Sequence, residues 1–103
     1  YIGDPNQPCG TLALCLGSPC YDTQLRAFAN PEVDAVVIGE CSEWAAGEYV
    51  RDAGACGRRL GMVLLGHRNS EEAGMAWIAR ELAQRLGVEI AHLVVEDPLR
   101  SCT

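Results

Sequence analysis

The 103-residue sequence is poor in basic side chains, with 8 lysine and arginine residues against 14 aspartate and glutamate residues and a net charge of −6. A general nucleic-acid surface needs a basic stripe, so this deficit argues against a nucleic-acid partner. No apolar run approaches the length of a bilayer span and no signal peptide is visible, so we expect no membrane partner. The chain begins with Tyr1 rather than Met, which favours a fragment of a longer protein.

The sequence also lacks a Cys-x-x-Cys pair, although it contains six cysteines. Without that spacing, a zinc ribbon or a thioredoxin-type site is not expected. The even count would fit a secreted disulfide framework, but Cys15 and Cys41 lie in or beside apolar strand patterns, where a free cysteine packs as a small hydrophobic residue. We therefore predict reduced thiols and a cytoplasmic protein, with a redox or disulfide module as an alternative that thiol titration tests.

Aromatic residues are few, at 6% of the chain, whereas hydrophobic residues together reach 49%, which is enough for one core. Strand and helix patterns alternate along the chain. The expected strands cover residues 11–16, 35–38, 60–65 and 88–95, and the expected helices cover residues 19–29, 43–56 and 70–86. This alternation predicts an α/β layered sandwich, with helices packed on a mostly parallel or mixed sheet. We expect a single domain over residues 11–98, a linker or tail over residues 1–10, and a tail over residues 99–103.

The helix expected over residues 70–86 has the clearest pattern. Its apolar stripe recurs at helical spacing and consists of Met75, Ile78, Leu82 and Leu86. This stripe is predicted to pack on the sheet. Ser70 is the expected N-cap and Gly87 the expected C-terminal cap. In the first helix, Ser18 is the expected N-cap, and Pro19 is expected at the first helical position.

Ionisable side chains follow two of the expected strands at the point where the chain enters a helix. Glu40 follows the second strand, and His67 and Glu71 follow the third. Because the carboxyl ends of parallel strands share one edge of a sheet, we expect these side chains to converge. Imidazole and carboxylate both bind divalent metals, so His67 and Glu71 are candidate ligands. Glu40 is a candidate catalytic residue, as a general base or as the group that orients a ligand. Two simpler interpretations stay open: a capped helix with a surface histidine, and a carboxylate at the positive end of a helix.

The motif Gly66-His67-x-x-Ser70-Glu71, preceded by a strand that ends in Gly39-Glu40, resembles the second half of the NIF-three-like dinuclear metal-centre family. In that family the His and Glu of the motif bind metal, and an earlier strand ends in Thr-Gly-Glu. The resemblance runs from about Leu12 to Pro98. One position departs from the family pattern, because Ile38 stands where the family often has Thr. Ser42-Glu43-Trp44 follows Gly39-Glu40, where many members have a His pair and others have Ser-Glu.

The resemblance implies a metal-dependent hydrolase, similar to GTP cyclohydrolase type two, in which two divalent metal ions (Zn, Fe, Mn or Ni) act on a nucleotide or phosphate-containing substrate. It also implies a homo-oligomer, in the form of a hexamer, and further metal ligands from an N-terminal half, because the His-His-Pro pair of the family is absent here. The other histidine, His92, lies in the last expected strand and is predicted to be structural. The alternative is a non-enzymatic metal-binding scaffold or regulatory interaction protein on the same fold.

Overall fold

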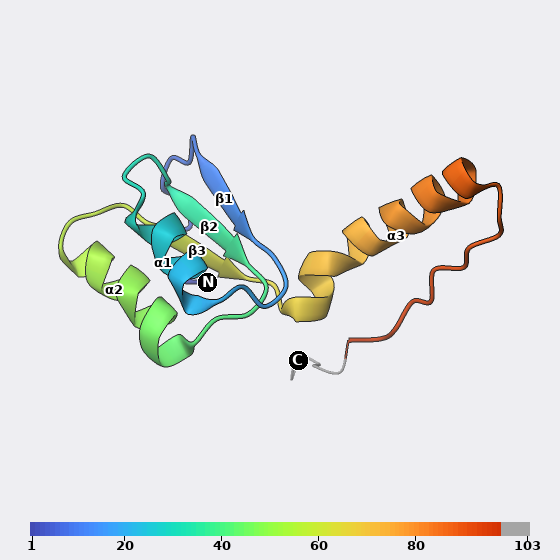
Figure 1. Cartoon of the computed structure of the whole chain (residues 1–103). Helices are drawn as coiled ribbons and strands as arrows, with labels where there is room; N and C mark the ends of the chain where they lie inside the picture. Colours follow the sequence, from blue (N-terminus) through green and yellow to red (C-terminus); the bar gives the residue numbers. More distant parts are fainter. Residues whose placement is uncertain (98–103) are drawn as a thin grey trace.

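The computed structural model describes residues 1–97, which form an α/β body (residues 1–66) and a projecting arm (residues 67–97) (Figure 1). The elements in chain order are β1 (Leu12–Cys15), α1 (Tyr21–Ala29), β2 (Ala35–Ile38), the π-helix η1 (Glu43–Gly47), α2 (Glu48–Ala55), β3 (Gly61–Leu64) and α3 (His67–Leu86). The strands form one parallel sheet in the order β1-β2-β3. The predicted α/β layered fold is therefore confirmed, with β1 and β3 shorter than expected.

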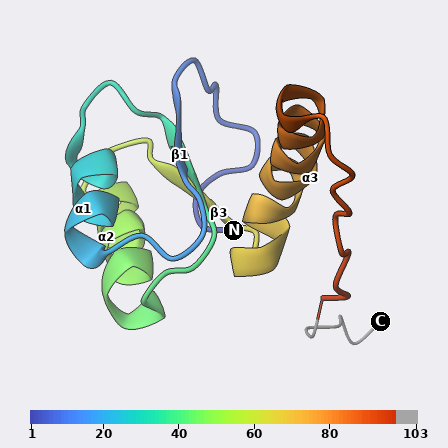
Figure 2. The same ribbon diagram turned by 45° about the vertical axis from the view of Figure 1, so that its right-hand side comes forward.

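The core of the body lies between one face of the sheet and the helices α1 and α2, which lie on the same side of it (Figures 1 and 2). Two right-handed crossovers that move in one direction across a parallel sheet place their helices on one face, which accounts for this arrangement. The buried hydrophobic residues are Cys15, Phe28, Val33, Val36, Ile38, Ala46, Val50, Leu60 and Met62. Phe28 of α1 stacks on Tyr49 of α2, with ring centroids 5.8 Å apart, so the two helices also contact each other.

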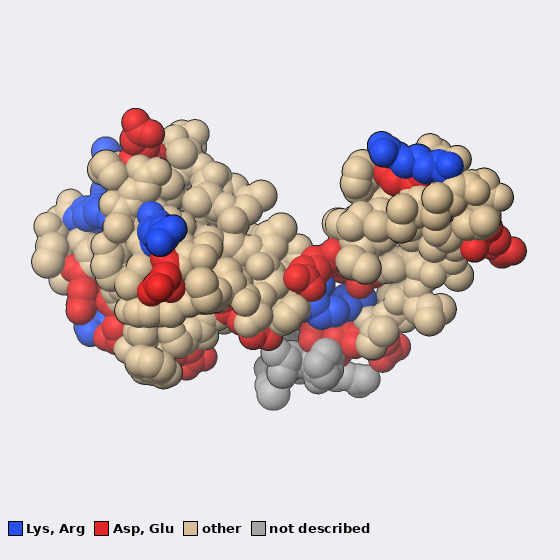
Figure 3. All heavy atoms as spheres, viewed as in Figure 1, with Lys and Arg blue, Asp and Glu red and all other residues tan. Residues whose placement is uncertain are grey.

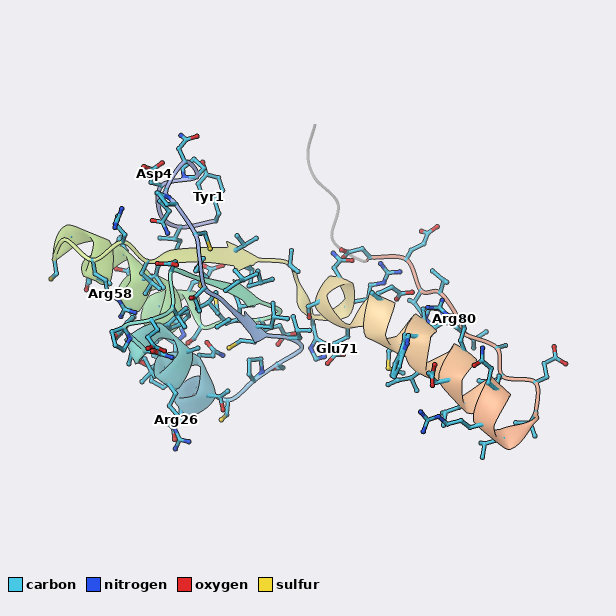
Figure 4. The ribbon with its side chains drawn as sticks, turned by 90° about the horizontal axis from the view of Figure 1, so that it is seen from above. Tyr1, Asp4, Arg26, Arg58, Glu71 and Arg80 are labelled. Carbon is cyan, nitrogen blue, oxygen red and sulfur yellow. The ribbon has the colours of Figure 1, made fainter. Side chains whose placement is uncertain are left out.

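No helix of residues 1–97 lies on the opposite face of the sheet. Successive side chains of a strand point to opposite faces, so every second residue points away from α1 and α2. Tyr1 and Asp4 lie on this side, opposite Arg26 of α1 (Figure 4). The backbone of Ile2 exchanges hydrogen bonds of 2.9 and 2.8 Å with Met62, which holds the N-terminal segment against β3.

The first helix begins later than the sequence predicts. It starts at Tyr21 with Cys20 at the N-cap position, so the prediction of Ser18 as N-cap and Pro19 at the first helical position is wrong. The first helical hydrogen bonds run from the N–H groups of Thr23 and Gln24 to the carbonyl oxygen of Cys20, whose own backbone is extended. Ser18 acts on the pKa of Glu40 instead. Ser18 thus belongs to the loop that follows β1 rather than to α1.

The second helix begins at Glu43, as expected, but its first turn is π-helical. The carbonyl oxygen of Ser42 accepts from the N–H groups of Ala45, Ala46 and Gly47 at 3.1, 2.8 and 3.4 Å. Trp44 points outward and is 83% exposed. Single π-helical turns are frequent at functional sites, and this one follows closely after Glu40.

The helix α3 does not pack on the sheet, so the predicted contact of its apolar stripe is wrong. Met75, Ile78, Leu82 and Leu86 are 53, 42, 42 and 64% exposed, and α3 contains no buried residue. The radius of gyration is 16.5 Å, whereas a compact domain of this length has a radius of about 13 Å. In Figure 3 the body and the arm form two masses joined by a narrower region that bears acidic side chains.

The predicted strand over residues 88–95 is also wrong, because residues 88–97 run back along α3 without forming a strand. A strand requires a neighbour for its backbone groups, and α3 carries this segment away from the sheet. Side chains tie the segment to α3 instead. His92 Nε2 lies 3.2 Å from Glu72 Oε1, and Asn69 Nδ2 donates to Asp97 Oδ2 at 2.5 Å. Residue 98 and the predicted tail over residues 99–103 lie outside the described residues.

The described cysteines carry free thiols, and they are Cys9, Cys15, Cys20, Cys41 and Cys56. Burial raises the pKa of the Cys15 thiol above its usual value, as expected for a cysteine that packs as a hydrophobic residue. Within residues 1–97, no helix combines the length and the hydropathy that crossing a bilayer requires.

Candidate metal site

The loops that follow β1, β2 and β3 meet at one edge of the sheet, and the first turn of α3 lies against them. The Gly17 carbonyl accepts from the Glu40 N–H at 2.9 Å, and the Gly17 N–H donates to Ser70 Oγ at 2.8 Å. Ser70 Oγ in turn donates to the carbonyl oxygen of His67 at 2.7 Å. Glu71 lies at this junction between the body and the arm (Figure 4). The predicted convergence of Glu40, His67 and Glu71 is therefore confirmed.

Two glycines make this close approach possible. A Cβ atom on Gly39 would lie 2.2 Å from the carbonyl oxygen of Gly17 and 2.6 Å from Ser70 Oγ. A Cβ atom on Gly17, whose φ is +67°, would lie 2.2 Å from Glu71 Oε1. Any side chain at these positions would push the loops apart, because only glycine allows the backbones to pack this tightly.

The helix α3 begins at His67, before the expected start at Ser70. Gly66, with φ of +86°, occupies the N-cap position, and its carbonyl oxygen accepts from the Ser70 N–H at 3.1 Å. The prediction of Ser70 as N-cap is therefore wrong, because its hydroxyl reaches Gly17 instead. His67 and Glu71 consequently lie one helical turn apart on one face of α3, rather than on opposite sides of a turn that precedes the helix.

The imidazole of His67 contacts a carboxylate at each of its nitrogens. Nδ1 lies 2.9 Å from Glu40 Oε1, and Nε2 lies 3.2 Å from Glu71 Oε2. The three side chains are each about half exposed, at 46% for His67, 53% for Glu40 and 48% for Glu71, so solutes reach them. Because the two ring nitrogens point in different directions, the two carboxylates lie on different sides of the ring.

These contacts shift the pKa values of the site in opposite directions. Hydrogen bonds from Ser18 and then from His67 lower the pKa of the Glu40 carboxyl below its usual value. The hydrogen bond to Glu40, together with the negative charge of Glu71, raises the pKa of His67. Both shifts favour the charged forms of these groups, so protons compete with a metal ion for His67 more strongly than for a histidine without these partners.

The donor atoms fit a divalent transition metal. When the single proton of neutral His67 sits on Nδ1, it donates to Glu40, and the lone pair of Nε2 points toward Glu71. One imidazole nitrogen and one carboxylate oxygen suit Zn, Fe, Mn or Ni. Glu40, on the far side of the ring, is not placed to bind the same ion. Within residues 1–97, no group of three or more His, Cys, Asp or Glu side chains is arranged to hold a metal.

Two open hollows flank Glu40. The first, of about 460 Å³, is lined by Glu40, Cys41, Leu65, His67 and Asp97 among others. The second, of about 480 Å³, is lined by Glu40, Cys41, Ser18, Gln24 and Trp44 among others. Ser18 and Asp97 line these hollows but were not predicted from the sequence as site residues. The position of Ser18 directly after Gly17 could have revealed it, because that loop ends a parallel strand, whereas Asp97 reaches the site through the course of the arm.

No family model, curated protein or solved structure matches this chain. The resemblance to the NIF-three-like family therefore stays a prediction, as do the metal, catalytic and assembly roles that it implies.

Proposed function

We propose that His67 and Glu71 bind a divalent metal ion and that Glu40 orients His67 for this role. The observation that carries the proposal is the continuous series of contacts from Glu40 through His67 to Glu71, at the carboxyl edge of a parallel sheet. A carboxylate bonded to the far nitrogen of a ligating histidine fixes its tautomer and raises its basicity. Glu40 contacts Nδ1 of His67 in this way, which leaves Nε2 available to bind a metal ion.

We propose further that the site serves a hydrolase acting on a nucleotide or phosphate-containing substrate, similar to GTP cyclohydrolase type two. Bound divalent metal would supply water activation and charge neutralisation at a phosphate oxygen. The amino end of α3 begins at His67 and favours an anionic group beside it. Glu40 borders both hollows, where it can accept a proton from a bound molecule. The remaining ligands, and those of a second ion, would come from outside residues 1–97.

Titration of Mn²⁺ into the 103-residue chain, followed by paramagnetic broadening of amide NMR signals, tests the ligands. We expect weak binding that broadens the signals of His67 and Glu71 first, and loss of this effect in His67→Ala and in Glu71→Ala. Glu81→Ala is the matched control, because Glu81 is an α3 carboxylate that pairs with Arg85 far from the site. Binding that persists in both site variants would contradict the proposal.

The role of Glu40 is tested by its effect on metal affinity and on the tautomer of His67. Removal of a carboxylate that supports a metal-bound histidine weakens metal binding by about 10–100-fold. We therefore expect Glu40→Ala to weaken Mn²⁺ binding within this range, and the ¹⁵N signals of neutral His67 to lose their preference for a proton on Nδ1. If the tautomer of His67 is unchanged in Glu40→Ala, Glu40 does not orient His67.

A non-enzymatic metal scaffold is the second candidate, and it is favoured because the described residues place just His67 and Glu71 on one ion. Hydrolysis of GTP and of a phosphodiester, assayed with the metal-loaded protein and again after chelation, separates the two. Turnover that a chelator abolishes supports the hydrolase. Metal binding without turnover supports the scaffold.

A further inference from the structure

The face of the sheet opposite α1 and α2 is apolar, and the part that residues 1–9 leave uncovered is exposed. It is formed by Leu12, Leu14, Val37, Val63 and Leu65, which are here called the open face. Leu12 and Leu14 are 53 and 62% exposed, and Val63 and Leu65 are 42 and 41% exposed. These side chains come from adjacent strands and form one patch, which is typical of a surface that another protein segment covers.

The arm carries the complementary elements. The stripe of α3 is exposed, and a hollow of about 380 Å³ separates it from residues 90–95. That segment is itself apolar and outward-facing, with Leu93, Val94 and Val95 at 81, 70 and 66% exposure. The arm therefore holds a helix that lacks a sheet, followed by a strand-like segment that has no strand beside it in the described part of the chain.

The topology of the sheet shows where such elements belong. The chain passes from β1 through β2 to β3 with both connecting helices on one face of the sheet. A further right-handed crossover puts its helix on the other face only if its strand lies on the far side of β1. Its helix then lies on the open face, and its strand joins the outer edge of β1, which has no strand beside it within residues 1–97. The outer edge of β3 is already occupied at Met62 by Ile2.

The arm of the same chain is held away from this position. Ser70 Oγ is bonded to the Gly17 N–H at 2.8 Å, and His67 is bonded to Glu40 at 2.9 Å, which fixes the first turn of α3 to the loops. From this anchor the helix runs outward (Figures 1 and 2). Folding α3 back on its own sheet would require both contacts to break. The arm can cover the open face of a second copy without breaking either contact.

We propose that α3 and residues 88–95 of one copy cover the open face and the β1 edge of a second copy, and that the exchange is reciprocal. The strands of the open face are four residues long, so the patch measures about 13 Å along the strands and about 14 Å across the three strands. Each contact then covers on the order of 200 Å², and two reciprocal contacts, with both surfaces of each removed from water, hide on the order of 800 Å². Pairing of residues 88–95 with the β1 edge in both copies adds to this area and brings it toward the range of stable interfaces. This arm exchange does not depend on metal binding at His67.

Sedimentation velocity measures the expected species, a particle of twice the 11.1 kDa chain mass. Leu14→Glu damages the open face, and Leu82→Glu damages the arm, so each variant alone should sediment as a monomer. At protein concentrations well above the wild-type dissociation constant, an equal mixture of the two should recover a weaker dimer, because one of its two contacts is intact: the arm of the first variant on the open face of the second. Trp44→Glu is the matched control. It places the same charge at an exposed aromatic on η1, outside both surfaces, and should stay dimeric.

Leu14 and Leu82 are 62 and 42% exposed, so neither change should prevent folding, and circular dichroism verifies this. Leu12→Glu and Ile78→Glu form a second pair that must behave in the same way. A monomeric wild-type chain overturns the proposal, as does a hexamer or other larger assembly. Disruption by only one variant of a pair would indicate contact between two sheets or two helices, and failure of the mixture to dimerise overturns the exchange itself.

Discussion

The body and the arm both contain amphipathic helices, yet only the body has a core. The helix α1, of nine residues, buries Phe28 completely, whereas α3, of 20 residues and with the clearest apolar stripe in the sequence, buries no residue. The difference lies in the connections. The loops around α1 return the chain to the sheet, but the first turn of α3 is bonded to loops that direct the helix outward. A periodic stripe thus identifies the face of a helix that requires a cover, and not the surface that covers it.

Truncation of one apolar residue in each region gives the largest expected contrast. Phe28→Ala should lower the free energy of unfolding by about 3–5 kcal/mol, because the ring is fully buried against Tyr49. Leu82→Ala should cost less than about 0.5 kcal/mol in the monomer, because this side chain is 42% exposed. Urea denaturation at concentrations where the chain is monomeric measures both. A Leu82→Ala loss of about 2 kcal/mol or more would show that α3 is packed against its own body.

A pair of glycine substitutions tests how tightly the loops pack at the junction between the body and the arm. Gly39→Ala places a Cβ against the Gly17 backbone and should cost about 1–3 kcal/mol or more. Gly54→Ala is the control within α2, where a Cβ has open space, and it should stabilise the chain by about 0.5–1 kcal/mol. Thermal melting followed by circular dichroism compares them. Equal melting temperatures for the two variants would contradict the tight contact between the loops.

Ser70→Ala tests the hydrogen bond that holds the arm. It leaves the buried N–H of Gly17 without its partner, which should cost about 1–3 kcal/mol. Amide hydrogen exchange at Gly17 should become faster. Ser42→Ala serves as the control, because the Ser42 side chain makes no capping bond to η1. Unchanged exchange at Gly17 would mean that Ser70 does not anchor the arm.

The smallest effect concerns pH at the same junction. The pKa of His67 is raised above 6.5, so its pairing stabilises the fold below about pH 6.5 and is lost as pH rises through the raised pKa. The pKa of Glu40 is lowered below 4.5, so its contribution is present above that pH and is lost as pH falls through the lowered pKa. Glu40→Gln should therefore bring the pKa of His67 down toward 6.5 in an NMR titration. An unchanged titration curve would contradict the pairing.

The convergence of the site was predictable from chain order. Gly39-Glu40 and Gly66-His67 each end a strand, and parallel strands place their carboxyl ends at one edge, so no long-range information was needed. The helix start was not predictable in this way. Ser70 has the residue type of an N-cap, but its hydroxyl bonds to Gly17, which lies 53 residues earlier in the chain.

The sequence by itself determined the alternation of strands and helices, the apolar face of α3, and the three side chains that meet at the sheet edge, because these follow from local periodicity and strand order. Only the tertiary structure decided the direction of α3 and the absence of a strand over residues 88–95. A strand exists only beside another strand, and the course of this segment is set by contacts between distant residues, foremost Gly17 with Ser70. No local pattern in the sequence encodes that contact.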